Sequence, residues 1–120
     1  MTSLQDQSTR IWVTFAKHGV HHYSNAPDDV NYLRAPHRHL FKFKATIAVY
    51  THDREIEFHQ FQNWLMSLYA DGGLDLSYQS CEMLANNLLD TIEAKYPGRP
   101  YYAVEVSEDG ECGAEVIRGY

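Results

Sequence analysis

Alternating hydrophobic and polar residues predict strands near both ends of the chain. Residues 11–15 alternate well enough to form one strand, and residues 37–50 keep a period of two over a longer stretch. Two further alternating segments, 102–107 and 112–117, are joined by an Asp-Gly step, which is a strong signal for a hairpin. The sequence therefore predicts one pair of strands in each half of the chain.

Hydrophobic residues spaced three and four apart predict two helices in the centre. The first begins at Phe58 and ends before Asp71, and its hydrophobic face is made by Phe58, Phe61, Leu65 and Leu68. The second has Ser80 as its N-cap and a stripe of leucine and isoleucine, and it is stopped by Pro97.

The order of these elements is β-β-α-α-β-β, which predicts an α+β fold. Two hairpins separated by a pair of helices make a four-stranded antiparallel sheet with both helices on one face. We expect one domain over residues 1–120, with residues 1–9 as a flexible N-terminus. The other face and the edges of such a sheet would be exposed in a monomer, so we expect subunits to associate into an oligomeric barrel.

Composition narrows the classes of function. The 120 residues are 44% hydrophobic and 22% charged, which is typical of a globular protein. A formal net charge of −6 disfavours nucleic-acid binding. No hydrophobic run is long enough for a membrane span, and the polar start matches no targeting signal. Two cysteines, Cys81 and Cys112, are too few for a disulfide scaffold, so we expect a reducing compartment, the cytoplasm.

Histidine is concentrated in the first half of the chain. All seven histidines lie between His18 and His59, together with five of the ten basic residues. Such a region would attract a small anion, although lysines on a strand edge also serve to prevent aggregation.

The spacing of these histidines indicates a metal site. His37 and His39 are two residues apart in the long strand, so they would point to the same face, about 6.5–7 Å apart. A third ligand would come from His18, His21 or His22, at the end of the first strand. Three histidines leave a fourth position of zinc open, as in catalytic zinc sites.

Several motifs occur together in an order that resembles a known family. They are Gly19-Val20-His21, His37-Arg38-His39, Ser80-Cys81-Glu82-Met83-Leu84-Ala85 and Val104-Glu105-Val106-Ser107-Glu108. With the β-β-α-α-β-β order, they make about residues 10 to 118 similar to the tunnelling-fold enzymes, specifically the 6-pyruvoyl- and 6-carboxy-tetrahydropterin synthases.

This resemblance implies roles for individual residues. His21, His37 and His39 match the family's zinc ligands, with Arg38 in place of a glycine. Glu108 matches the glutamate that anchors the amino-pyrimidinone edge of the pterin. The family assembles as a hexamer of two stacked trimers with active sites between subunits, which implies a homo-oligomer here.

The sequence also departs from the family pattern. The family's catalytic cysteine falls at Leu33, and its Asp-His pair falls at Asp75 and Leu76. The usual groups for proton transfer are therefore missing, and other residues would have to replace them. Asp75 and His52 are our candidate catalytic residues, and Arg38 is a candidate for binding substrate, with Arg34, Lys42 and Lys44 as further groups that could neutralise a phosphate.

Three functions follow from these patterns. The resemblance favours a zinc-dependent enzyme of the tetrahydropterin synthase type, acting on a reduced pterin or a related purine-derived heterocycle. Leu33 and Leu76 favour an alternative, a non-catalytic module that binds such a heterocycle and retains the zinc pocket. A third alternative is a metal-dependent phosphoesterase that uses His52, Asp53, Glu55 and Glu57.

Overall fold

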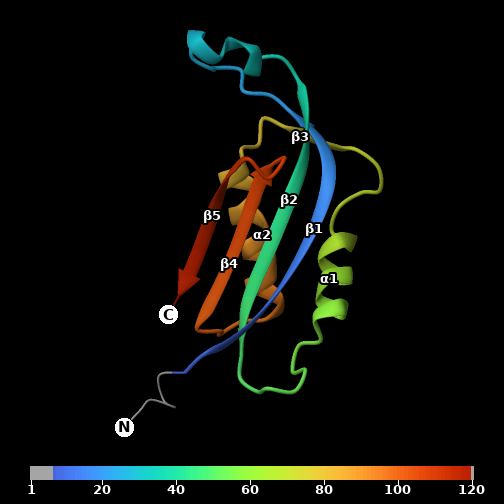
Figure 1. Ribbon diagram of the computed structural model, residues 1–120, viewed down its shortest axis with the longest axis vertical. Helices are drawn as coiled ribbons and strands as arrows, with labels where there is room; N and C mark the ends of the chain where they lie inside the picture. Colours follow the sequence, from blue (N-terminus) through green and yellow to red (C-terminus); the bar gives the residue numbers. More distant parts are fainter. Residues whose placement is uncertain (1–6, 120) are drawn as a thin grey trace.

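The computed structural model describes residues 7–119 and contains one twisted sheet with helices packed against it (Figure 1). The strand order is β3-β1-β2-β4-β5. The four long strands are antiparallel neighbours, and they are β1 (Thr9–His21), β2 (His37–Val49), β4 (Tyr101–Glu108) and β5 (Cys112–Gly119). The short strand β3 (Leu74–Ser77) runs parallel to β1 at one edge of the sheet.

The α+β fold with two hairpins is confirmed, but the sheet has a fifth strand that the sequence analysis missed. β3 has only four residues and follows two glycines, so it carries too short a pattern to separate a strand from a loop. β1 is also longer than expected, because Lys17 and Gly19 interrupt its hydrophobic face although the backbone pairing continues to His21. Of the expected flexible segment, residues 1–6 lie outside the described residues, and Thr9 begins β1.

Both helices begin where the sequence predicts. α1 (Phe58–Ser67) has Glu57 as its N-cap, and α2 (Cys81–Lys95) has Ser80, whose hydroxyl accepts a hydrogen bond from the Met83 amide at 3.2 Å. A short 3-10 helix, η2 (Asp28–Leu33), lies in the long connection between β1 and β2. Among the described residues, no helix is both long and apolar enough to cross a membrane.

The sheet has one covered and one uncovered face. Odd-numbered residues of β1 and β2 and even-numbered residues of β4 point toward the helices, since the register pairs Phe15 with Phe43 and Phe43 with Val106. With the buried residues of α1 and α2 they form a single hydrophobic core. The opposite face, called the outer face below, carries exposed side chains such as Trp12 and Ile117. A functional residue on β1 or β2 is therefore placed on one face or the other by whether its number is odd or even.

Candidate metal centre

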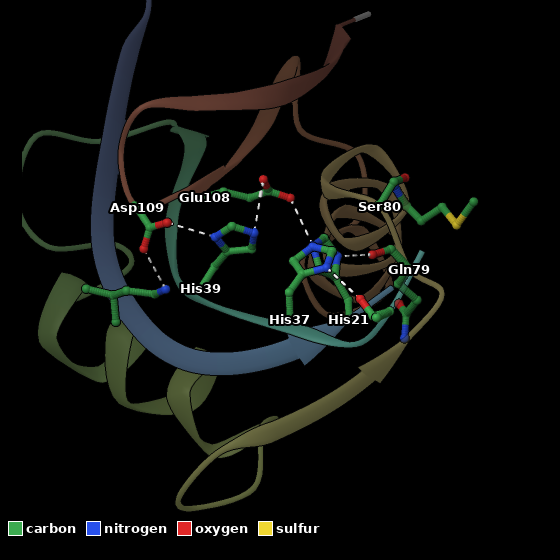
Figure 2. A network of polar contacts seen from close by, with 10 residues as sticks. His21, His37, His39, Gln79, Ser80, Glu108 and Asp109 are labelled. Atoms are coloured by element: carbon green, nitrogen blue, oxygen red, sulfur yellow. Dashed lines mark hydrogen bonds and ion pairs between the residues drawn. The ribbon is translucent and has the colours of Figure 1, made fainter. Parts of the chain in front are cut away.

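Three histidines meet where β1 ends and β2 begins. His21 lies directly opposite His37 in the antiparallel pair, and Gly19 lies opposite His39. These are odd-numbered positions, so all three imidazoles lie on the helix-covered face. The ring centroids are 4.5, 4.9 and 5.4 Å apart, and one nitrogen of each ring lies within 4.8 Å of the other two. Figure 2 shows the rings pointing toward one another from the two strands.

The hydrogen bonds of the rings show which nitrogens are free. Nδ1 of His21 lies 2.9 Å from the Gln79 carbonyl oxygen, and Nδ1 of His37 lies 3.0 Å from a backbone carbonyl two residues earlier. Nδ1 of His39 lies 2.8 Å from a carboxylate oxygen of Asp109. These oxygens only accept, so each Nδ1 donates and each Nε2 of a neutral ring carries a lone pair. An acceptor behind each imidazole is typical of histidines that ligate a metal.

The carboxylate of Glu108 faces the same space from the end of β4. Its oxygens lie 3.1 Å from Nε2 of His21 and 3.5 Å from Nε2 of His39. Both Nε2 atoms are nevertheless buried without a hydrogen bond, since neither has a hydrogen to donate once Nδ1 is the donor. Lone pairs and a carboxylate facing one another cost free energy until a proton or a cation enters. The donor set of three imidazole nitrogens fits zinc, with a fourth position left for water or substrate.

Asp109 was predicted only as a turn residue, but it also holds His39 in place. One carboxylate oxygen accepts from Nδ1 of His39, and the other accepts from the Leu40 amide at 2.9 Å. The Leu40 carbonyl in turn accepts from the Asp109 amide at 2.8 Å. These contacts, first the Leu40 amide and then His39, lower the pKa of Asp109. The sequence offered one signal for this role, since a residue that follows Glu108 at a hairpin tip must lie beside the same strand end.

A cleft of about 540 Å³ opens beside the histidines. Its walls come from the ends of β1, β2 and β4 and the first turn of α2, and they include Tyr23, Leu33, Tyr78, Glu82, Met83 and Glu108. Cys81, at the start of α2, is buried, and burial followed by the nearby charges of Glu108 and Glu82 raises its pKa to about 12. Cys81 is therefore a packed thiol with little nucleophilic character.

The structure brings together only part of the predicted site. His21, His37, His39 and Glu108 converge, whereas Arg38 lies on the outer face between His37 and His39. Asp75 pairs with Val20, and its two neighbours in β3 are buried against the core, so its side chain also lies on the outer face. Within one chain, neither Arg38 nor Asp75 reaches the ligand that the histidines would hold.

His52 lies at the opposite end of β2 from His37. The strand between them has thirteen residues, which corresponds to about 40 Å. There His52 Nε2 lies 2.9 Å from the Thr9 hydroxyl oxygen. Within one chain His52 therefore cannot transfer a proton at the metal centre.

The two leucines at the family's catalytic positions have different surroundings. Leu33 ends η2 and lines the cleft. Leu76 is 5% exposed in the core, where its Cδ1 would lie 2.8 Å from a Cβ built on Gly19. A side chain at position 19 would therefore crowd Leu76 and Phe41, and Leu76 packs over Gly19 as a core residue.

Comparisons with known proteins place the fold. No family model matches the sequence, and no curated protein matches it in sequence either. The structure matches a 6-pyruvoyltetrahydropterin synthase of Plasmodium vivax, in a form with a catalytic glutamate replaced by alanine, with a TM-score of 0.69 and 14% identity over 96% of this chain and 100% of that chain. The Plasmodium falciparum 6-pyruvoyl tetrahydropterin synthase matches with a TM-score of 0.66 and 14% identity, over 94% of this chain and 99% of that chain.

At this level of identity the matches concern the fold. They extend over nearly the whole of each chain, so the resemblance noted in the sequence motifs reaches from β1 to β5. Together with the helix positions and the pairing of the strands, they lead to one conclusion: this chain has the fold of the 6-pyruvoyltetrahydropterin synthases.

Proposed function

We propose that this protein is a zinc-dependent enzyme of the tetrahydropterin synthase type, acting on a reduced pterin or a related purine-derived heterocycle. The observation that carries the proposal is the set of three histidines whose Nδ1 atoms are all engaged and whose rings each bring one nitrogen within 4.8 Å of the others. Glu108 lies beside Nε2 of His21 and Nε2 of His39. The fold shared with 6-pyruvoyltetrahydropterin synthases supports it.

His21, His37 and His39 would hold the zinc ion. When bound, zinc supplies Lewis-acid chemistry at the oxygens of the substrate side chain, which stabilises the negative charge left when a proton leaves the neighbouring carbon. Glu108 would accept hydrogen bonds from the N–H groups of an amino-pyrimidinone edge, and charge-assisted bonds of this kind are strong.

The proton would be taken by another group of the cleft. In the Plasmodium vivax enzyme a glutamate is named as a catalytic residue. In this chain His22 and Glu82 line the cleft, His22 half-buried and Glu82 exposed. A carboxylate or an imidazole there would replace the thiol of the family, whose position is occupied by Leu33.

Leu33 supports a second candidate function, a binding module without turnover. A leucine in the cleft cannot transfer a proton, and Leu76 belongs to the core. Both candidates share the zinc ion and the heterocycle, and they differ in whether product forms.

The test uses purified protein loaded with zinc. Metal analysis should give one zinc ion per chain, and calorimetric titration should show binding of 7,8-dihydroneopterin or its triphosphate. Chromatography after incubation with each compound separates the two candidates, because only an enzyme gives product, and Glu82→Gln or His22→Ala should then slow it. Protein that binds no zinc, or that binds neither compound when loaded, would refute the proposal.

A further inference from the structure

We propose that Asp75 is a positioning residue for His21, the most buried imidazole of the candidate metal centre. This inference rests on the proposed function, since it concerns a ligand of the same zinc ion. His21 lies at the end of β1, and its Nδ1 donates to the Gln79 carbonyl oxygen at 2.9 Å (Figure 2). The nitrogen of an imidazole that binds a metal is set by the hydrogen bond that the other nitrogen makes. Whatever fixes the Gln79 carbonyl therefore also orients the ring of His21.

Gln79 lies in the segment that ends β3 and leads into α2, residues 75–79, called the 75–79 turn below. A second hydrogen bond ties this turn to β1, because the amide of His22 donates to the Ser77 carbonyl oxygen at 2.9 Å. Within the turn, the Gln79 amide donates to the Leu76 carbonyl oxygen at 3.0 Å. The turn and the end of β1 are therefore joined through the backbone as well as through the imidazole.

The 75–79 turn has a backbone conformation that needs support. Val20 pairs with Asp75, but the next residue of β1 pairs with Ser77. Leu76 is therefore an extra residue in β3, and an extra residue bends its strand. Ser77 follows with a φ of 54°, in the left-handed region that residues other than glycine seldom adopt. Two residues later the chain reaches the imidazole of His21.

The side chain of Asp75 supports this conformation. Its Oδ1 accepts a hydrogen bond from the Ser77 amide at 3.1 Å, which is the contact of an Asx turn. Leu74 and Leu76, on either side of Asp75, are buried in the core, so the strand that carries the carboxylate is fixed. All these contacts lie within one chain and need no side chain from a second copy. Asp75 therefore acts on the ring of His21 through the path of the 75–79 turn.

The other two imidazoles do not depend on the 75–79 turn. Nδ1 of His37 contacts a backbone carbonyl oxygen two residues earlier, and Nδ1 of His39 contacts the carboxylate of Asp109. A change in the turn should therefore affect His21 alone. This selectivity separates a positioning role from a general loss of stability, which would disturb all three rings.

The experiment follows the ring nitrogens of the three histidines by NMR in metal-free protein, at a pH where the imidazoles are neutral. Asp75→Ala removes the acceptor for the Ser77 amide, so the tautomer of His21 should become mixed while those of His37 and His39 stay unchanged. Asp75→Asn keeps an acceptor and should retain the tautomer of His21. An unchanged His21 ring in Asp75→Ala, or an equal change in all three rings, would overturn the proposal.

Zinc affinity gives a second readout on the same variants. Asp75→Ala should weaken zinc binding by about threefold to tenfold, because it acts through the turn, whereas the loss of a direct partner of a ligand costs about 10- to 100-fold. Asp71→Ala is the matched control, since it removes an exposed carboxylate just before β3. This control and Asp75→Asn should both leave the affinity unchanged. Equal losses in Asp75→Asn and Asp75→Ala would assign the effect to charge and overturn the proposal.

Two variants of Ser77 test the same path if Asp75→Ala does not fold. Ser77→Gly adopts a positive φ freely and should leave the tautomer of His21 unchanged, whereas the β-branched side chain of Ser77→Val disfavours this φ and should mix it. The reverse order would overturn the proposal. Failure of the proposed function is recognised separately. If the tautomer of His21 responds to Asp75→Ala but zinc-loaded protein binds no pterin, the proposed function fails while the role of Asp75 stands.

Discussion

The two ends of β2 carry similar polar residues, and they differ in whether those residues have hydrogen-bond or ion-pair partners. At the His37 end, three imidazoles and Glu108 converge, and buried Nε2 atoms lack hydrogen-bond partners. At the other end, residues 51–59 also contain histidines and carboxylates. There Asp53 pairs with Arg54, Glu55 pairs with Arg99 and accepts from the Tyr50 amide, and Glu57 caps α1.

This difference separates a candidate metal site from a network of structural contacts. The three carboxylates of residues 51–59 are engaged by arginines or by backbone amides, and no metal-binding cluster is found there among residues 7–119. The arrangement gives no support to a phosphoesterase that uses these residues. At the His37 end the rings are held in position by hydrogen bonds to Nδ1, while Nε2 of His21 and Nε2 of His39 are buried without a hydrogen-bond partner.

The largest expected effect distinguishes the two ends directly. His37→Ala removes one of three nitrogen ligands, so the affinity for zinc should fall by on the order of a thousandfold. His52→Ala is the matched control, since it removes an imidazole from the far end of the same strand and should leave the affinity unchanged. Competition with a chelating dye measures both. Equal affinities of the two variants would remove the distinction between the ends of β2.

A smaller loss of zinc affinity is expected when His39 is kept but the hydrogen bond to its Nδ1 atom is weakened. Asp109→Asn keeps a residue suited to the positive φ of 58° and keeps an acceptor for the Leu40 amide, but it removes the charge beside His39. Loss of such a carboxylate should lower the affinity for zinc by about 10- to 100-fold. The ring NMR signals of His39 provide an independent readout, because their tautomer should become mixed. An unchanged affinity would show that Asp109 serves the hairpin alone.

At the end of β2 opposite His37, removing the charge of Glu55 should lower the stability of the fold and leave the affinity for zinc unchanged. Glu55→Gln retains an acceptor for the Tyr50 amide but loses the ion pair with Arg99, whose side chain is 13% exposed. The free energy of unfolding should fall by about 1 kcal/mol, measured by urea denaturation. A loss of zinc binding in this variant would mean that the two ends are coupled.

The smallest effect is a dependence of stability on pH at the same end. The Tyr50 amide first, and Arg99 beside it, lower the pKa of Glu55 below 4.5, and backbone amides at the start of α1 lower that of Glu57. These carboxylates therefore stabilise the fold above pH 4.5, and this contribution should be lost as the pH falls through their lowered pKa values. Urea midpoints over this range should decline less in a variant with Glu55→Gln and Glu57→Gln. If the urea midpoint declined equally in the unmodified protein and in the variant, the pH dependence would come from titratable groups other than Glu55 and Glu57.

Patterns of neighbouring residues in the sequence were sufficient to predict most of the strands and helices. The period-two segment of β2, the capped helix α2 and the Asp-Gly turn were recognised because each depends on neighbours within a few residues. β3 was not recognised, since four residues gain their strand conformation from pairing with β1, more than fifty residues earlier.

The sequence alone determined which residues could bind a metal, because His37 and His39 share a face by spacing and His21 by the match of motifs. Tertiary structure decided the rest. The strand register placed Glu108 at the imidazoles and put Arg38 and Asp75 on the outer face, and the length of β2 separated His52 from the site. The physical reason is that a charged side chain acts only within a few ångströms of its partner, and that distance depends on contacts between segments far apart in the chain.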